Sequence, residues 1–450
     1  MEAMPFHLDM KRIRSVLFAL LLLAAPAAVQ AQFAYVTNNG AVILTGYSGT
    51  AGTVVISNFV NVITNYVFYN RSSLTNLTIP ASVNSFGDEE FFSCQNLASV
   101  TLCGGVTNMG DFAFGSCASL TNVTISNGVA VLGGSAFDNC TKLAGITIPA
   151  SVTTIGPDAF EGCSVLAGVT ICGVTNMGVQ AFYNCASLTN VTLSNGVTSI
   201  GSYAFYGCTS LPGITIPASV ANIGEFAFSG CPGLTNATFA SGVPAIGAYA
   251  FYDCTNLAGV TIPASVGSIG SYAFYECAHL AGVAIPGVTN IGAFAFADCF
   301  ALGGVTIPAS VTTIQQDAFA YCTNLTGVYF TGNAPGVDTN VFLSDNEATA
   351  YYLPDTAGWE QFATNTGLTP VLWNPAIETG AGSGFGVTGN YFGFNITNTA
   401  NLTVVVEVCT NLAGQIWVPL ATNTLVNGAF FFSEPVKASH SGRFYGLGVP

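Results

Sequence analysis

The stretch IPASVTTIGPDAFEGC, residues 148–163, recurs along the chain with most of its apolar letters unchanged. Close copies are IPASVANIGEFAFSGC at residues 216–231 and IPASVGSIGSYAFYEC at residues 262–277. The constant letters are an Ile-Pro, an Ile-Gly, an Ala-Phe and a closing Cys. A unit that recurs at a fixed spacing of this size is typical of a solenoid, in which each repeat forms one coil and equivalent residues stack.

Eleven cysteines mark the repeat, at intervals of 23 residues with two intervals of 22. Each has a Phe three residues before it and a Leu three residues after it. Stacked coils would place these side chains in continuous interior files. The predicted Cys ladder consists of Cys94, Cys117, Cys140, Cys163, Cys185, Cys208, Cys231, Cys254, Cys277, Cys299 and Cys322.

The Leu after each Cys opens the pattern Leu-x-x-Val/Ile-x-Ile/Leu, as in Leu143, Ile146 and Ile148. This pattern is typical of the short strand of a leucine-rich repeat, with its apolar residues pointing inward. The Ile-Gly and Ala-Phe pairs then form a returning arm, with the Phe in the core beside the Cys. We predict that the Gly after Ile allows a turn that other side chains resist. These glycines are Gly156, Gly201, Gly224, Gly247, Gly270 and Gly292.

We therefore predict a β-rich leucine-rich-repeat solenoid, with short strands on its concave face and about twelve coils of 22–23 residues. A small all-β C-terminal module should follow, because alternating apolar strands separated by turn sequences occupy the tail. The expected division is a signal peptide (1–31), an N-terminal β lead-in (32–53), the solenoid (54–330), its C-terminal cap (331–374), a linker (375–385) and a sandwich-like β-module (386–450).

The repeats resemble those of BspA-like bacterial surface proteins, whose unit reads close to C-x-x-L-x-x-I-x-I-P-x-x-V-x-x-I-G-x-x-A-F. The resemblance covers roughly residues 54–330 and extends to the strand-rich entry. It implies a closing turn after the coils, with Trp359 and Phe362 as a lid. Arg71 departs from the pattern, because it stands where the first ladder Cys would be. The resemblance also implies a protein of the bacterial surface.

The N-terminal segment has the features of a Sec-type signal peptide. Lys11, Arg12 and Arg14 precede an apolar run, and Val29 and Ala31 are small residues placed for cleavage after Ala31. The alternative is a retained membrane anchor, for which the run is short. We expect a secreted or cell-surface protein with no transmembrane helix in the mature chain.

Charge limits the possible partners. The formal net charge is −15, and no Lys or Arg occurs between Lys142 and Lys437. Such a chain has no patch of basic residues to bind phosphate backbones, so nucleic acid is not an expected partner. It also lacks the basic cluster that favours anionic lipid.

Fourteen cysteines in an exported chain would ordinarily suggest disulfides. Neighbouring ladder cysteines would lie about 5 Å apart, so distance does not exclude pairing, but eleven in one file cannot all pair. Cys103 and Cys172 lie on another edge of the coil, and Cys409 is alone in the tail. We expect buried free thiols that act as small hydrophobes, in a line that does not converge on a metal.

No catalytic arrangement is predicted. After signal removal only His279 and His440 remain, and neither lies at nucleophile spacing from a Ser or Cys. The carboxylates are scattered along the arms, without the paired placement that glycoside hydrolysis needs. We predict a non-enzymatic protein with no catalytic, cofactor or metal site.

Two faces are candidates for binding. The first is aromatic and flanks the buried Phe on the returning arm, where stacking area and hydroxyls suit sugar or protein; the alternative is that these rings only stack on one another. Its residues are Tyr183, Tyr203, Tyr206, Phe226, Tyr249, Tyr252, Tyr272, Tyr275 and Phe294. The second is a file of Thr on the outer side of the strands, which sheet stability alone explains.

We therefore expect an exported repeat scaffold that mediates protein binding or adhesion at the bacterial cell surface. Its partner would be a protein or a glycan. The alternatives are a carbohydrate-binding surface protein that uses the aromatic face and a structural component of the envelope. The tail module would serve in attachment or sorting, or only add stability.

Overall fold

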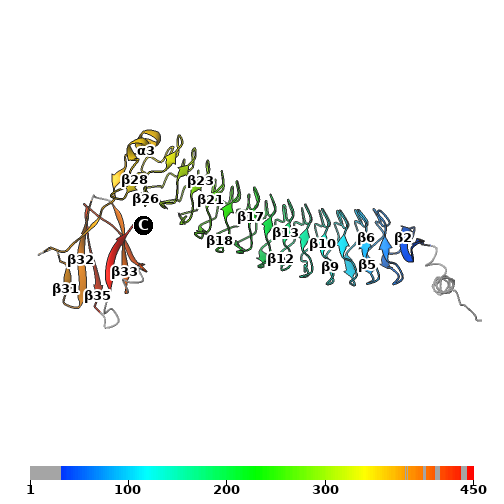
Figure 1. Cartoon of the computed structure of the whole chain (residues 1–450). Helices are drawn as coiled ribbons and strands as arrows, with labels where there is room; N and C mark the ends of the chain where they lie inside the picture. Colours follow the sequence, from blue (N-terminus) through cyan, green and yellow to red (C-terminus); the bar gives the residue numbers. More distant parts are fainter. Residues whose placement is uncertain (1–31, 381, 383, 399–401, 411–415, 437–442) are drawn as a thin grey trace, which may run out of the picture. The chain divides into compact units, whose positions relative to one another are not determined.

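The computed structural model describes residues 32–380, 382, 384–398, 402–410, 416–436 and 443–450. The predicted signal peptide, residues 1–31, and His440 lie outside these ranges. The described chain divides into two compact units at Leu211 and Pro212. Within each unit the repeats are stacked side by side (Figure 1). The predicted leucine-rich-repeat solenoid with a small all-β C-terminal part is therefore confirmed.

In the first unit the coils carry two files of short strands. The first file contains the strands that the Leu-x-x-Val/Ile-x-Ile/Leu pattern forms, preceded by β3. It comprises β3 (Thr53–Val55), β5 (Asn76–Ile79), β7 (Ser99–Leu102), β9 (Asn122–Thr124), β12 (Gly168–Ile171) and β14 (Asn190–Leu193). The other file comprises β1 (Phe33–Asn38), β2 (Ala41–Tyr47), β4 (Val62–Ile63), β6 (Ser85–Phe86), β8 (Asn108–Met109), β10 (Val131–Leu132), β11 (Thr154–Ile155), β13 (Asn176–Met177) and β15 (Ser199–Ile200). β1 and β2 are antiparallel, and parallel pairing begins at β4.

Parallel pairing joins residues one repeat apart. Leu77 pairs with Val100, and Thr78 with Thr101, so like residues lie beside like across the coils. Leu77 and Val100 are buried, whereas the Thr residues between the apolar positions face outward. Because side chains alternate along a strand, this register places the apolar letters of every coil in one interior.

The second unit continues the same organisation. Its first file comprises β16 (Gly213–Ile216), β18 (Asn236–Phe239), β20 (Gly259–Thr261), β22 (Gly282–Ala284), β24 (Gly304–Ile307), β26 (Gly327–Phe330), β28 (Thr349–Tyr352) and β29 (Val371–Leu372). Its second file comprises β17 (Asn222–Ile223), β19 (Ala245–Ile246), β21 (Ser268–Ile269), β23 (Asn290–Ile291), β25 (Thr313–Ile314) and β27 (Gly336–Val337).

A continuous file of Phe rings fills the interior of each unit. In the second unit Phe274 lies fully buried between Phe251 and Phe296, with ring centroids 5.4 and 5.3 Å apart and nearly parallel planes. The file continues to Phe342, which stacks on Phe319 at 5.7 Å. Phe342 lies in the segment expected as the cap, and Asp345, three residues later, takes the position of the ladder Cys.

The glycines after Ile have a different role from the one predicted. Gly156 and Gly270 do not adopt positive φ, so they form no turn reserved for glycine. Instead, a Cβ on Gly156 would lie 2.5 Å from the backbone nitrogen of Gly134, and one on Gly270 would lie 2.5 Å from that of Ala248. At Gly156 and Gly270 adjacent coils therefore approach too closely for a side chain.

The helix α3 (Trp359–Thr366) covers the last coils of the second unit, at the top of the yellow segment in Figure 1. Trp359 and Phe362 are buried, and each ring centroid lies 5.1 Å from that of Phe330. These two aromatic residues therefore form the lid that the family resemblance implies.

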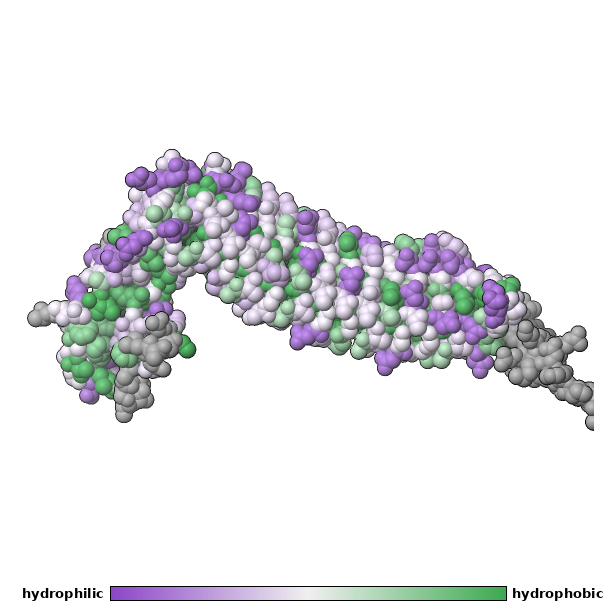
Figure 2. Space-filling view, viewed as in Figure 1, coloured by the Kyte–Doolittle hydropathy of each residue, from purple (hydrophilic) through white to green (hydrophobic). Residues whose placement is uncertain are grey.

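The C-terminal strands form two small antiparallel sheets. They are β30 (Ala376–Glu378), β31 (Gly386–Thr388), β32 (Tyr391–Thr397) and β35 (Ala429–Pro435) in one, and β33 (Thr403–Cys409), β34 (Val418–Thr424) and β36 (Phe444–Gly448) in the other. β30 lies within the segment expected as a linker and pairs with β32. Hydrophobic residues gather on the surface of the C-terminal part of the chain (Figure 2). Val387 of β31 and Phe431 of β35 are exposed.

The core of these strands is shared with the last coils. Tyr329 and Tyr351 of β26 and β28 belong to the same buried cluster as Phe394 and Val404. Trp373 joins them, and its Nε1–H donates to the carbonyl oxygen of Thr403 at 3.3 Å. The tail of the second unit is thus packed against the outer face of the strands that end its solenoid.

One buried carboxyl group gives the first unit a pH-dependent stability. Glu90 is fully buried, neither carboxyl oxygen makes a hydrogen bond of normal geometry, and burial raises its pKa to about 9. The folded state therefore holds a proton that the unfolded chain loses near pH 4.5. The resulting stabilisation is complete below pH 4.5 and is lost as the pH rises toward 9.

We expect the urea midpoint of the first unit to fall between pH 5 and pH 8, and Glu90→Gln to remove most of that fall. The glutamine has the same shape but no charge to bury. Urea titrations at the two pH values measure the effect. An unchanged pH dependence in the variant would assign it to other groups.

Candidate binding faces

The predicted aromatic residues are all half-buried and lie on the returning arms. Tyr183, Tyr203 and Tyr206 belong to the first unit, and the other six belong to the second. In the first unit Tyr183 stacks on Tyr206 at 4.9 Å, and Tyr203 lies tilted against Tyr206 at 5.8 Å. The structure therefore brings these three rings into one group.

In the second unit the rings form two parallel files. Phe226, Tyr249, Tyr272 and Phe294 stack in order, with centroids 4.3, 4.7 and 4.7 Å apart. Beside them Tyr252 stacks on Tyr275 at 5.1 Å. Each Tyr of the second file also contacts a ring of the first file at a tilted angle. The ring centroids of Tyr275 and Tyr272, for example, lie 5.5 Å apart. We call these six residues the aromatic arm.

Stacking determines what the aromatic arm offers to a ligand. Within a file the ring faces lie against one another with interplanar angles of 4–12°. The parts left for solvent are ring edges and, at four of the six positions, phenol hydroxyls. A sugar that binds by stacking needs an open ring face. The aromatic arm therefore suits polar and charged groups better than it suits a sugar ring.

The backbone beneath the first aromatic file is left-handed. Phe226, Tyr249, Tyr272 and Phe294 have φ of 55–58°. This position is left-handed in other coils too, where Asp158 and Asn340 occupy it. The sequence pattern alone does not reveal this conformation, because residues of very different types occupy the position.

A file of carboxylates runs beside the aromatic arm. Asp253, Glu276 and Asp298 each precede the ladder Cys of successive coils and are half-exposed. Burial, followed by the charges of Asp253 and Asp298, raises the pKa of Glu276. Burial and a hydrogen bond to Asp298 raise the pKa of the Tyr275 hydroxyl. From the sequence these acids were expected to be solvated charges on the arms, mostly one in each coil.

The register of the strands places the outward-facing Thr residues in files, as the sequence predicts. Thr78, Thr101 and Thr124 lie side by side in the first unit, and Thr215, Thr238 and Thr261 do so in the second. In the second unit the file ends where Tyr329 pairs with Thr306. Thr306 Oγ1 donates to the backbone oxygen of Pro450, so the tail contacts this end of the file.

The ladder cysteines face neither surface. All eleven are buried free thiols, and ten donate to the backbone oxygen of the Phe in the preceding coil. In the first unit these contacts are 3.1–3.3 Å long, from Cys94 to Phe68, Cys117 to Phe91, Cys140 to Phe114, Cys163 to Phe137, Cys185 to Phe160 and Cys208 to Phe182. In the second unit they are 3.1–3.4 Å long, from Cys254 to Phe228, Cys277 to Phe251, Cys299 to Phe274 and Cys322 to Phe296.

The thiol is thus more than the small hydrophobe that the sequence suggests. It fills the interior and also supplies a weak donor to a buried carbonyl oxygen. Burial raises the pKa of the Cys163 thiol to about 12, so the group remains protonated at neutral pH. The partner is the Phe of the preceding coil, 25 or 26 residues earlier, so no spacing within one repeat indicates this bond.

We expect alkylation of the native chain at pH 8 to modify Cys103 and Cys172 rapidly and the buried thiols slowly. Only these two cysteines are exposed among the described residues, and the thiolate is the reactive form. Mass spectrometry of the alkylated chain counts them. In denaturant without reductant all fourteen should react; a lower number would show disulfides.

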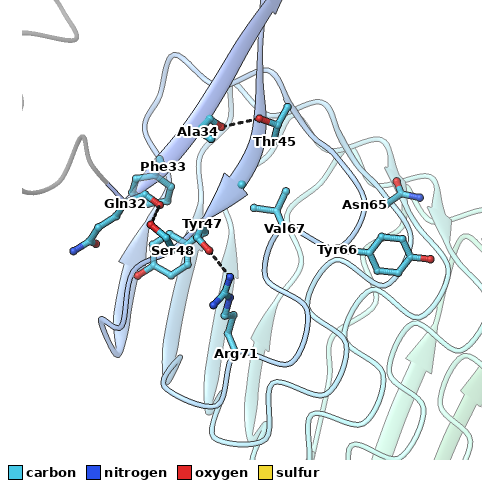
Figure 3. Close-up of a pocket in the computed structure, with 11 residues that line it drawn as sticks. Gln32, Phe33, Ala34, Thr45, Tyr47, Ser48, Asn65, Tyr66, Val67 and Arg71 are labelled. Carbon is cyan, nitrogen blue, oxygen red and sulfur yellow. Dashed lines mark hydrogen bonds between the residues drawn. The ribbon is translucent and has the colours of Figure 1, made fainter.

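A polar depression of about 500 Å³ lies at the entry of the first unit (Figure 3). Gln32, Tyr47, Ser48 and Arg71 line it. Arg71 Nη2 donates to the backbone oxygen of Tyr47, and the guanidinium lies 6.0 Å above the Tyr47 ring. Because Arg71 takes the first ladder position, this contact closes the end of the interior with a polar group.

Among the described residues, no three His, Cys, Asp or Glu side chains are placed to hold a metal ion. His279 is exposed, and its Nδ1 lies 2.7 Å from the carbonyl oxygen of Thr255. No helix in the described ranges combines the length and the apolar character needed to cross a bilayer.

Short parallel strands repeated every 22–23 residues around a Phe, Cys and Leu interior define a leucine-rich-repeat solenoid. A family model for the BspA type leucine rich repeat region matches residues 61–186, 175–299 and 244–361. The chain therefore belongs to the BspA-type leucine-rich-repeat family. Proteins of this kind are repeat scaffolds.

One solved structure shows the same fold, and two others are similar in sequence. A leucine-rich repeat protein from Bacteroides ovatus ATCC 8483 is 22% identical over 76% of this chain and 98% of its own, with a TM-score of 0.50. A leucine rich cell surface protein from Faecalibacterium prausnitzii A2-165 is 26% identical over 67% and 94%, with a TM-score of 0.35. The T. pallidum leucine rich repeat protein is 27% identical over 47% and 90%, with a TM-score of 0.35. No curated protein matches the chain in sequence.

Proposed function

We propose that the chain is an exported, non-enzymatic repeat scaffold that binds a protein partner at the bacterial cell surface. The observation that carries this proposal is the contrast between the two sides of each coil. Phe and Leu recur in the interior of the coils, with Cys beside them in eleven coils, while half-exposed positions on the arms change from Asp and Glu to Tyr and Phe. Variable residues on a constant scaffold are typical of repeat proteins that bind through an extended surface.

Export rests on the N-terminal segment. The full chain should be cleaved after Ala31 when a bacterial host produces it, so that Gln32 becomes the first residue. The intact mass of the secreted protein measures this. Retention of residues 1–31 on a membrane-associated protein would support the anchor instead.

Protein binding is tested by adding fluorescently labelled mature chain to intact bacterial and host cells. We expect binding that is lost when the cells are treated with protease and kept when they are treated with glycosidases. Loss with glycosidases alone would favour the carbohydrate-binding alternative. No binding to any surface would contradict the proposal and favour a structural role in the envelope.

A further inference from the structure

We propose that the aromatic arm and the adjacent carboxylates Asp253, Glu276 and Asp298 bind a segment of the partner that carries Lys or Arg side chains. This inference rests on the proposed function and names its site and the chemistry of its partner. The parts of the site all belong to the second unit and lie on successive returning arms.

The first support is the choice of residues on a left-handed backbone. Bulky side chains in this conformation cost on the order of 1–2 kcal/mol each. Asn and Asp adopt it more easily, and Asn340 and Asp317 do so in neighbouring coils of the same unit. Stacking of aromatic pairs contributes about 0.5–1.5 kcal/mol and offsets this only in part. Four aromatic residues in a row are therefore not required by the fold and point to a binding role.

The second support is charge. The carboxylates of Asp253, Glu276 and Asp298 follow one another on adjacent coils, and their mutual repulsion is one cause of the raised pKa of Glu276. The sequence from residue 143 to residue 436 contains no Lys or Arg that could neutralise them. Further along the chain, Arg443 is already paired, because it forms an ion pair with Glu434 at 2.9 Å. A basic group on another molecule would relieve this repulsion.

The third support is the way a basic side chain fits both parts of the site. Its charged end can reach a carboxylate, and a guanidinium does so with two parallel hydrogen bonds. Its aliphatic stem can lie along the exposed edges of Tyr252 and Tyr275. Four phenol hydroxyls add acceptors for the remaining N–H groups. A neutral or acidic segment could use only the ring edges.

Coil spacing indicates the form of the segment. Asp253 and Asp298 are two coils apart, which corresponds to roughly 9.6 Å at the usual spacing of adjacent strands. Every third residue of a polyproline-type segment recurs at roughly 9.3 Å. A segment with Arg at every third position would therefore present its charges in register with alternate coils.

The test is a fluorescence anisotropy titration of a labelled (Arg-Pro-Pro)4 peptide with the mature full chain, with (Glu-Pro-Pro)4 as the peptide control. We expect the basic peptide to bind and the acidic peptide not to bind. Asp253→Asn, Glu276→Gln and Asp298→Asn together should weaken binding about tenfold. Tyr249→Asn with Tyr272→Asn should also weaken it several-fold, because it removes ring edges while placing Asn where the backbone favours it.

The matched control is Asp138→Asn, Asp158→Asn and Glu161→Gln, which removes three carboxylates from arms of the first unit. It should change the affinity less than twofold. Thermal unfolding confirms that each variant is folded. Equal weakening by both triple variants would reduce the effect to general charge attraction and overturn the inference.

Failure of the inference is distinguishable from failure of the proposed function. Protease-sensitive binding to cells without any binding of the basic peptide would overturn the inference and leave the function intact. Peptide binding that depends on the second-unit carboxylates, in a chain that binds no cell surface, would support the site and contradict the function.

Discussion

Replacing Phe274 with Ala is expected to lower the free energy of unfolding of the second unit by about 3–5 kcal/mol. The ring is fully buried and lies between two other rings, so the substitution removes apolar burial and both stacking contacts. The surrounding coils cannot close the cavity, because each is held in register with its neighbours by strand pairing. Urea unfolding followed by circular dichroism measures the loss.

Phe300→Ala is the matched control, since Phe300 lies in the same unit and its side chain is 44% exposed. It should change the free energy of unfolding by less than about 0.5 kcal/mol. A solenoid unfolds through contacts between neighbouring coils, so the loss at Phe274 should also broaden the transition. If Phe274→Ala were as mild as Phe300→Ala, the stacked Phe file would not be the core of this unit.

Gly156→Ala is expected to destabilise the first unit by about 1–3 kcal/mol. The added methyl group would lie 2.5 Å from the backbone nitrogen of Gly134, and backbone cannot move aside as a flexible side chain could. The coils would have to separate locally, which weakens the strand pairing of Thr154 and Ile155 with β10. Urea titration and thermal unfolding of the variant measure this effect.

Gly145→Ala is the control in the same unit. A Cβ at this position meets no atom within 4 Å, and the backbone does not adopt positive φ. The substitution should be neutral, or stabilising by about 0.4–1 kcal/mol through a lower entropy of the unfolded chain. Equal destabilisation by the two substitutions would mean that the close approach of coils is not the reason for Gly156.

The comparison of these glycines shows where sequence reasoning reaches its limit. The recurrence of Gly after Ile was visible in the sequence, but two physical reasons produce the same letter. A turn with positive φ and a close approach between coils both exclude side chains. Only the distance between neighbouring coils distinguishes them, and that distance depends on residues one repeat away.

The same limit applies to the candidate site. The aromatic residues could be identified from their positions beside the buried Phe, and their alternative role as mutual stacking partners could be stated. Whether their faces or their edges meet solvent depends on the ring orientations, which the stacking across coils sets. Asp253, Glu276 and Asp298 could be placed on successive arms from the sequence, because each precedes a ladder Cys. Their charge interactions with one another and with the tyrosines depend on how the coils stack.

For the ladder thiols, burial could be predicted from the sequence but the hydrogen bonds could not. Their burial followed from the repeat, because a letter that recurs with every turn of a solenoid belongs to its interior. Their hydrogen bonds to Phe carbonyl oxygens join residues 25 or 26 positions apart, as from Cys185 to Phe160 and from Cys277 to Phe251. Such a bond exists only when two coils are stacked.

The repeat period and the apolar residues were sufficient to predict the solenoid and the Phe and Cys files, and the family resemblance implied the aromatic lid. The physical reason is that each coil buries its apolar residues only against equivalent residues one period away, so the linear pattern contains the packing. The close contacts at glycine, the left-handed backbone under the aromatic residues, and the exposed ring edges depend on coil spacing and orientation. Those quantities arise when the coils stack, and no single repeat contains them.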